Sequence, residues 1–505
     1  MASLAVAVTL AVAAVQVSRH AREWVVQWLS EHYHSEVQLS QFQLSAVFPM
    51  VQASGEGLIL HFEGRQDLPP LLAIQRFTLR ATLIGLLRNP RHVQLVHLEG
   101  MELNIPPRGQ SPSGTNRFKG TLGKMRSVYF GRIAAENTTL KILSKKPGKD
   151  PLQFDITNLE LYSTRSGALD FDATLTNPKP PGDILSSGTL GPWQAGAPSL
   201  TPVSGSYTFE NADLGIFRGI AGILSSEGKY TGVLERIEVD GTTDTPDFQV
   251  TRAGHPVHLQ TTFHAIVDGT DGDTYLQPVE ARFGKTTLVT RGSVSGTPGR
   301  KGKTITLEVE GSEARIEDLL LFAVRQAPPL TGTVRLKTNF ELPPGPDDIS
   351  EKLKLDGSFE INSARFTSRT VQQRVDNLSQ QSRGEPEQAK GKGETSAEDD
   401  VISAMRGGFR MAGGVITFSD LRFQVPAAQV RLNGTYEIED EALDLRGMLT
   451  TDAKLSQMTT GVKSFLLRAV DPFFSNRRGG AAIPIKITGT VKEPSYGLDM
   501  RRGRK

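Results

Sequence analysis

Strict alternation of apolar and polar residues over short segments is the feature that most restricts the fold of this chain. Residues 331–342 read TGTVRLKTNFEL, and residues 352–362 read KLKLDGSFEIN. In the first segment Val334, Leu336 and Phe340 share one face, while charged or polar residues occupy the other. This period of two is that of a β-strand with one dry and one wet face, as in antiparallel sheets covered on one side. The same pattern recurs from residue 36 to residue 491, so we predict a mainly β, antiparallel body.

A short repeat containing glycine lies inside these segments. Glycine followed by Ser or Thr and then by Val, Phe or Tyr begins at six positions: Gly205, Gly292, Gly332, Gly357, Gly434 and Gly489. In each case the glycine is in register with the apolar face. Glycine usually weakens a strand, so its recurrence needs a reason. The first interpretation is a bulge or strong local twist, which a long curved sheet requires. The second is room for an aromatic neighbour or an apolar ligand.

The first 34 residues are distinct from the body. Residues 2–17 read ASLAVAVTLAVAAVQV, an apolar run shorter than the roughly 20 residues of a spanning helix and without a preceding basic residue. We interpret this run as a membrane anchor; a cleaved signal peptide and a buried helix are the alternatives. Trp24 and Trp28 fit either a membrane interface or a helix packed on the following sheet. Arg19 and Arg22 follow the run, which by charge alone would place the body in the cytoplasm.

The body divides by composition. The predicted regions are an N-terminal β region at 35–105, a central β region at 125–382, an insert at 383–400 and a C-terminal β region at 401–500. The insert reads RGEPEQAKGKGETSAEDD and has no large apolar residue, so we predict it to be disordered and dispensable for folding. Short helices are expected at four places: 81–88, 316–325, 367–382 and 455–474.

Composition and motifs give no indication of a catalytic, metal-binding or nucleic-acid-binding site. The chain has 505 residues, a net charge of +2 and no cysteine, so neither nucleic-acid binding nor a thiolate site is indicated. None of the motifs for nucleotide binding, hydrolysis or zinc proteolysis is found in the sequence. The segment DGTDGD at 268–273 lacks the spacing of a calcium loop, and we interpret it as a hairpin turn. We therefore predict no catalytic residue, no metal site, no cofactor and no enzyme activity.

The two ends of the chain resemble those of AsmA-like envelope proteins. At the N-terminal end the resemblance is carried by SEVQLSQFQLS, VQASGEGLIL and the short LIGLL segment before Pro90. At the C-terminal end it is carried by GGVITFSDLRFQVPAAQVRLNGTYEIEDEALDLRGML and the closing ITGTVKEP. The middle of the chain resembles the family only in its general pattern of strands.

This resemblance implies a protein of a bacterial inner membrane, single-pass through residues 2–17, with its body in the periplasm. It also implies an elongated, curled, taco-like sheet whose apolar groove serves phospholipid transport or outer-membrane homeostasis. In that case acyl chains would contact the dry stripes of two strands paired across 343–351. The candidate residues are Val334, Leu336, Phe340, Leu353, Leu355, Phe359 and Ile361. The alternatives are an assembly or scaffold factor whose groove is filled by its own side chains, and an envelope glycosidase.

Overall fold

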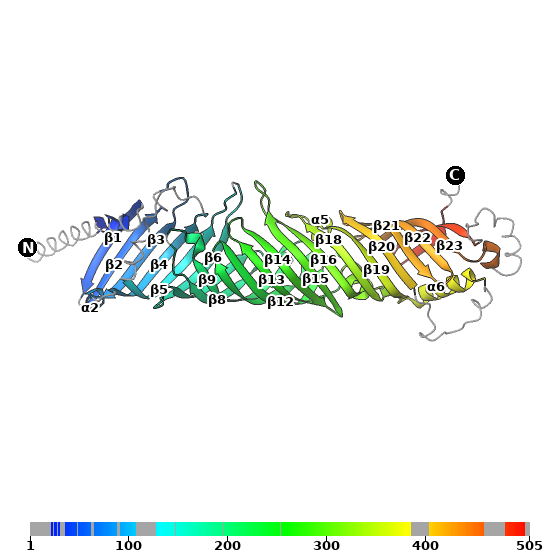
Figure 1. Cartoon of the computed structure of the whole chain (residues 1–505), viewed down its shortest axis with the longest axis horizontal. Coiled ribbons are helices and arrows are strands. Elements are labelled where there is room, and N and C mark those ends of the chain that lie inside the picture. Colours follow the sequence, from blue (N-terminus) through cyan, green and yellow to red (C-terminus); the bar gives the residue numbers. More distant parts are fainter. Residues whose placement is uncertain are drawn as a thin grey trace, which may run out of the picture.

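A computed structural model shows the chain as one elongated, curled sheet (Figure 1). It describes residues 22–499 except 24, 28, 31–35, 48, 62–64, 88–90, 108–127, 147, 195, 253, 385–402 and 459–479. Strands account for 65% of the residues, which confirms the mainly β fold, and the sheet forms a half-barrel. The predicted anchor at 2–17, the insert from 385 onward and most of the expected helix at 455–474 lie outside the described residues. No helix among the described residues is long and apolar enough to span a membrane.

Most strands that follow one another in the chain lie side by side in the sheet, oblique to the long axis (Figure 1); the two-residue strands β10 and β17 instead pair with β12 and β19. The first part contains β1 (Val37–Val47), β2 (Met50–Leu60), β3 (Leu72–Thr82), β4 (Arg91–Ile105), β5 (Val128–Ile142), β6 (Leu152–Ser163), β7 (Leu169–Pro178), β8 (Pro181–Leu190), β9 (Pro202–Asp213), β10 (Ile220–Ala221), β11 (Ile223–Val233), β12 (Arg236–Val250) and β13 (Val257–Asp268). The second part contains β14 (Asp273–Phe283), β15 (Thr286–Gly296), β16 (Lys303–Arg315), β17 (Leu330–Thr331), β18 (Thr333–Leu342), β19 (Lys354–Phe366), β20 (Ser403–Ala412), β21 (Val415–Val425), β22 (Ala428–Glu437), β23 (Ala442–Thr451), β24 (Ala482–Thr490) and β25 (Pro494–Leu498).

One pair departs from the predicted antiparallel arrangement. Strands β4 and β5 are parallel, with Val96 beside Ile133 and Ile105 beside Ile142. A parallel pair needs a connection of a dozen or more residues to bring the chain back, and residues 106–127 supply that length. Alternation along a strand fixes which side chain faces inward but not the direction of the neighbouring strand, so this pair could not be read from the pattern.

The expected hairpin between residues 331–342 and 352–362 is confirmed. Strands β18 and β19 are antiparallel neighbours, with Leu336 opposite Phe359 and Phe340 opposite Leu355. Their connection contains the short helix α5 (Ile349–Lys352), which begins where the Asp348 side chain accepts a hydrogen bond from the Ser350 amide.

Three other helices correspond to expected ones, and the described residues also contain three short 3-10 turns. Helix α2 (Leu83–Leu87) follows β3, α4 (Ile316–Leu320) follows β16 and α6 (Arg369–Ser382) follows β19. Helix α4 ends five residues earlier than expected, and α6 agrees closely with the predicted 367–382. The 3-10 turns are η3 (Pro198–Leu200), η4 (Leu214–Ile216) and η6 (Leu455–Met458).

Candidate functional site: the inner face of the sheet

The inner face consists of the side chains that share a side of the sheet with Val334, as cross-strand register defines it. From β18 this face continues to Leu307 on β16 and to Phe409 on β20 through directly opposed residues. In the middle of strands β6–β23 the described inner-facing positions are apolar residues, Gly, Ser, Thr or Tyr, and none is charged. The curl therefore encloses an uncharged surface.

Charged side chains lie on the outer face, where they pair across strands. Lys337 Nζ lies 2.7 Å from Glu310 on β16, and Lys354 Nζ lies 3.0 Å from Glu341 on β18. These side chains are largely exposed, so each pair contributes little stability, about 0–1 kcal/mol. These charged side chains instead help to fix the register of the strands, because a slip of one residue would turn them toward the apolar side.

The structure places the seven candidate residues in two different environments. Val334 and Ile361 are 0% and 1% exposed and belong to a packed cluster with Ala314, Leu330 and Ala364. Helix α4 covers this cluster, so the two residues present no surface to a ligand. The other candidates are partly exposed: Leu336, Phe340, Leu353, Leu355 and Phe359. Contact with lipid stays a prediction for those five.

Buried clusters at the two ends of the inner face show where the chain fills its own curl. At the N-terminal end Val25 and Val26 pack against a cluster of Leu39, Ile74 and Phe77. The helix expected around Trp24 thus packs on the sheet in its described part. At the C-terminal end Val375 of α6 belongs to the largest cluster, with side chains of β21–β24. Between these ends the inner face is mixed: Phe171 on β7 is partly buried, whereas Leu161 on β6 and Phe283 on β14 are buried.

Hydroxyl groups gather on the inner face of β8–β13. The Tyr230 and Ser186 hydroxyls lie 2.7 Å apart, and the Tyr207 and Ser226 hydroxyls lie 3.1 Å apart. Burial raises the pKa of both tyrosines, so these side chains are neutral hydrogen-bonding groups. An uncharged acceptor, such as an ester carbonyl, is the kind of group that such hydroxyls bind.

The repeated glycines are explained mainly by close backbone approach. A Cβ added at Gly292 or Gly434 would lie 2.0 Å from a carbonyl oxygen of the neighbouring strand, and both glycines have φ above +150°. At Gly205 the added atom would also meet the Tyr230 hydroxyl at 2.7 Å. Close approach of the neighbouring backbone thus accounts for glycine at Gly292 and Gly434, and an aromatic neighbour, Tyr230, adds to it at Gly205.

The two rims of the curled sheet meet along its opening. We call rim 1 the edge that carries the β5–β6 connection (143–151) and the β12–β13 connection (251–256). Rim 2 is the opposite edge, which carries the β13–β14 turn (269–272), the β18–β19 connection (343–353) and the β22–β23 turn (438–441). The Lys145 amide of rim 1 donates to the Thr270 carbonyl of rim 2 at 2.9 Å. The sheet is thus bridged across its opening by hydrogen bonds between connections far apart in sequence.

A buried ion cluster forms the first of these bridges. Lys149 of rim 1, with its side chain 6% exposed, lies 2.6 Å from Asp273 and 3.9 Å from Asp271. Lys146 pairs with Asp271 at 3.0 Å. Burial opposes ionisation of Asp271, but the hydrogen bond from Lys146 and the nearby Lys149 outweigh it, so the pKa of Asp271 lies below its usual value. Residues 268–273 do contain a hairpin turn, as expected, but the pairing with residues 146–149 leaves no local sequence signal.

A second bridge lies nearer the C-terminal end. Arg252 of rim 1 forms ion pairs with Asp348 at 3.1 Å and Glu351 at 2.9 Å on rim 2. The Arg325 amide donates to the Glu441 carboxylate at 2.8 Å. The Tyr436 hydroxyl of the inner face donates to the Ala323 carbonyl at 3.1 Å. Together the two bridges hold the half-barrel in its curled form over the central inner face.

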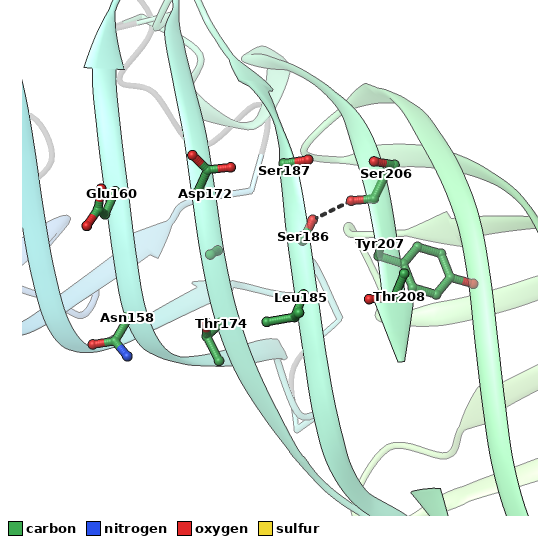
Figure 2. A pocket seen from close by; sticks show the side chains of 11 residues that line it. Asn158, Glu160, Asp172, Thr174, Leu185, Ser186, Ser187, Ser206, Tyr207 and Thr208 are labelled. Carbon is green, nitrogen blue, oxygen red and sulfur yellow. Dashed lines mark hydrogen bonds between the residues drawn. The ribbon is translucent and has the colours of Figure 1, made fainter. Parts of the chain in front are cut away.

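A depression of about 480 Å³ lies at β6–β9, lined by outer-facing residues such as Leu185 and also by Ser186 and Tyr207 of the inner face (Figure 2). It presents two carboxylates, Glu160 and Asp172, on directly opposed strand positions. Hydrogen bonds from Tyr162 and Arg132 hold the pKa of Glu160 below its usual value. A glycosidase acid needs the opposite shift, so this pair does not favour hydrolysis. No cluster of three or more potential metal ligands is found among the described residues.

No family model matches the sequence of this chain, and no curated protein matches it.

Proposed function

We propose that this protein is anchored in a bacterial inner membrane, lies in the periplasm, and carries phospholipid acyl chains along the inner face of its curled sheet. Such a role would serve phospholipid transport or outer-membrane homeostasis. The observation that supports it most is the uncharged inner face, which is partly exposed at positions such as Phe171, Leu336 and Phe340. The location rests on the resemblance of the chain ends to AsmA-like proteins.

The energetics of such a face are sufficient without further chemistry. Each buried methylene contributes about 0.8 kcal/mol, so a chain of about 16 carbons contributes on the order of 10 kcal/mol. A phosphate group would lose its hydration among these side chains with no cation to replace it. We therefore expect tails to lie on the inner face and head groups to remain outside it.

The test compares two variants that add the same charge to opposite faces of β18. Phe340→Asp places a carboxylate on the inner face, and Asn339→Asp places it on the exposed outer face one residue away. The protein and both variants are purified from membranes in mild detergent, and bound lipid is quantified by mass spectrometry. We expect bound phospholipid in the parent protein and in Asn339→Asp, with a strong reduction in Phe340→Asp. Absence of lipid from the parent protein, or equal amounts in both variants, contradicts the proposal.

The scaffold alternative is favoured by one observation, the packed state of Val334 and Ile361. If self-packing of this kind extended along the whole curl, the protein would be a rigid body for assembling outer-membrane components. The same lipid measurement separates the two, because a filled interior retains no lipid in any variant.

A further inference from the structure

Helix α2 presents its large side chains to solvent. Leu83, Ile84 and Leu87 are 45%, 62% and 80% exposed, and the last two are the most exposed of the large hydrophobic side chains in the described part of the chain. The buried residue of the helix is Gly85. Because α2 lies against the sheet through its smallest residue, its apolar side chains point away from the protein.

The contact through Gly85 is a close one. A Cβ at this position would lie 2.8 Å from the His92 carbonyl oxygen of β4. The Gly85 amide donates to the Thr82 hydroxyl at 3.1 Å, and the Leu83 amide donates to the Pro49 carbonyl at 3.0 Å. These contacts hold the helix in an orientation opposite to that of an ordinary amphipathic helix, whose apolar side faces the core.

The exposed tip of α2 lies at the same end of the long axis as β1, which Arg22 contacts (Figure 1). Arg22 Nε donates to the Leu39 carbonyl at 2.8 Å, and Val25 packs on the inner face of β1–β3. Leu39 lies at the far end of β1 from Met50, so Arg22 and α2 share this end of the long axis but lie at opposite ends of the strands (Figure 1). The exposed side chain of Met50, directly opposite Thr82 on the neighbouring strand, extends the apolar surface of the tip.

We propose that the tip of α2 docks on a lipid bilayer, with Leu83, Ile84 and Leu87 inserted below the head groups. Three neighbouring apolar side chains that the described part of the chain leaves exposed suit the boundary between head groups and acyl chains. Arg80, exposed near the end of β3, adds attraction for anionic head groups. The bilayer is the chosen occupant because the described chain begins at this end of the long axis, with Arg22, and the sequence before it contains the apolar run 2–17. The inference depends on the proposed anchoring for the presence of a membrane there, but not on lipid carriage.

The test uses the absence of cysteine in the chain, which allows one label per molecule. Full-length Leu87→Cys and Gln66→Cys are each labelled with a polarity-sensitive fluorophore and reconstituted into vesicles of neutral and anionic phospholipid. Gln66 is exposed in the β2–β3 connection, at the opposite ends of the strands that carry α2. We expect a blue-shifted emission at position 87, quenched by lipids with a quencher in the acyl chain, and an aqueous spectrum at position 66.

Equal quenching at the two positions would show only that this end lies near the membrane, and it would overturn the proposal, as would an aqueous spectrum at position 87. A blue shift that appears without vesicles and grows with protein concentration would identify a second copy as the occupant. As a further check, a label at Leu83→Cys should lose its shift when Ile84→Ser and Leu87→Ser are added. Lipid carriage is not scored in this experiment, so failure here leaves the proposed function to its own test.

Discussion

Replacement of Lys149 by alanine should open the first bridge between the rims. The ammonium group lies among buried carboxylates, since Asp271 and Asp273 have side chains 9% and 7% exposed. Removing one partner of a buried ion pair costs about 3–5 kcal/mol, because the remaining charge is left uncompensated. Asp273 retains the Gly296 amide as a donor at 2.9 Å, so we expect the lower end of that range, about 3 kcal/mol.

Amide hydrogen exchange measures the opening of this bridge at the residues that form it. The amides of Lys145 and Gly299 donate across the opening to Thr270 and Gly148, so their exchange requires the rims to separate. A change of about 3 kcal/mol corresponds to exchange faster by about two orders of magnitude. Lys337→Ala removes an exposed outer-face pair with no rim contact and should leave both amides unchanged.

Acidification should act on the same bridge. The pKa of Asp271 is lower in the folded protein than its usual value, so its stabilising contribution is complete above that usual value. The contribution is lost as the pH falls through the lowered folded pKa.

If exchange at Lys145 is the same in Lys149→Ala as in the parent protein, the bridge does not hold the rims together and the prediction for Lys149→Ala is refuted.

Three further predictions concern positions inside the sheet. Val334→Glu should lower the free energy of unfolding by several kcal/mol and reduce the soluble yield. Leu336→Glu, at a partly exposed position, should fold but bind less lipid. Thermal denaturation and lipid analysis distinguish the two outcomes. Burial raises the pKa of Tyr436 to about 12, so a spectrophotometric titration should include a tyrosine step near pH 12, and Tyr436→Phe should remove that step. Gly447→Ala would bring a Cβ to 1.7 Å from the Arg431 carbonyl oxygen, and its midpoint of denaturation should fall clearly below that of the parent.

Sequence alternation was sufficient to predict the strands and the dry face. The pairing of β18 with β19 followed from two alternating segments joined by a short connection, because such segments form hairpins readily. The same alternation could not separate Val334 from Leu336, which are two residues apart on one face. They differ because α4 and Leu330 cover the first and not the second, and this cover depends on how connections fold back over the inner face.

Contacts between the rims could not be predicted from the sequence. Lys149 and Asp273 are 124 residues apart, and nothing local to either marks the other as its partner. Their meeting depends on the tilt and curl of the whole sheet, which accumulate over many strands. The exposure of the α2 tip could not be predicted from the sequence either. LIGLL is apolar throughout, and only the contact at Gly85 decides which side of the helix faces the sheet.

The most direct test of acyl-chain carriage is photocrosslinking from the inner face in living cells. A photoreactive amino acid replaces Phe340 on the inner face or Lys337 on the outer face of the same strand. After irradiation the purified protein is examined by mass spectrometry for a covalent phospholipid adduct. Our account predicts an adduct at position 340 and none at position 337. A protein without an adduct at position 340, or with equal adducts at both positions, would contradict it.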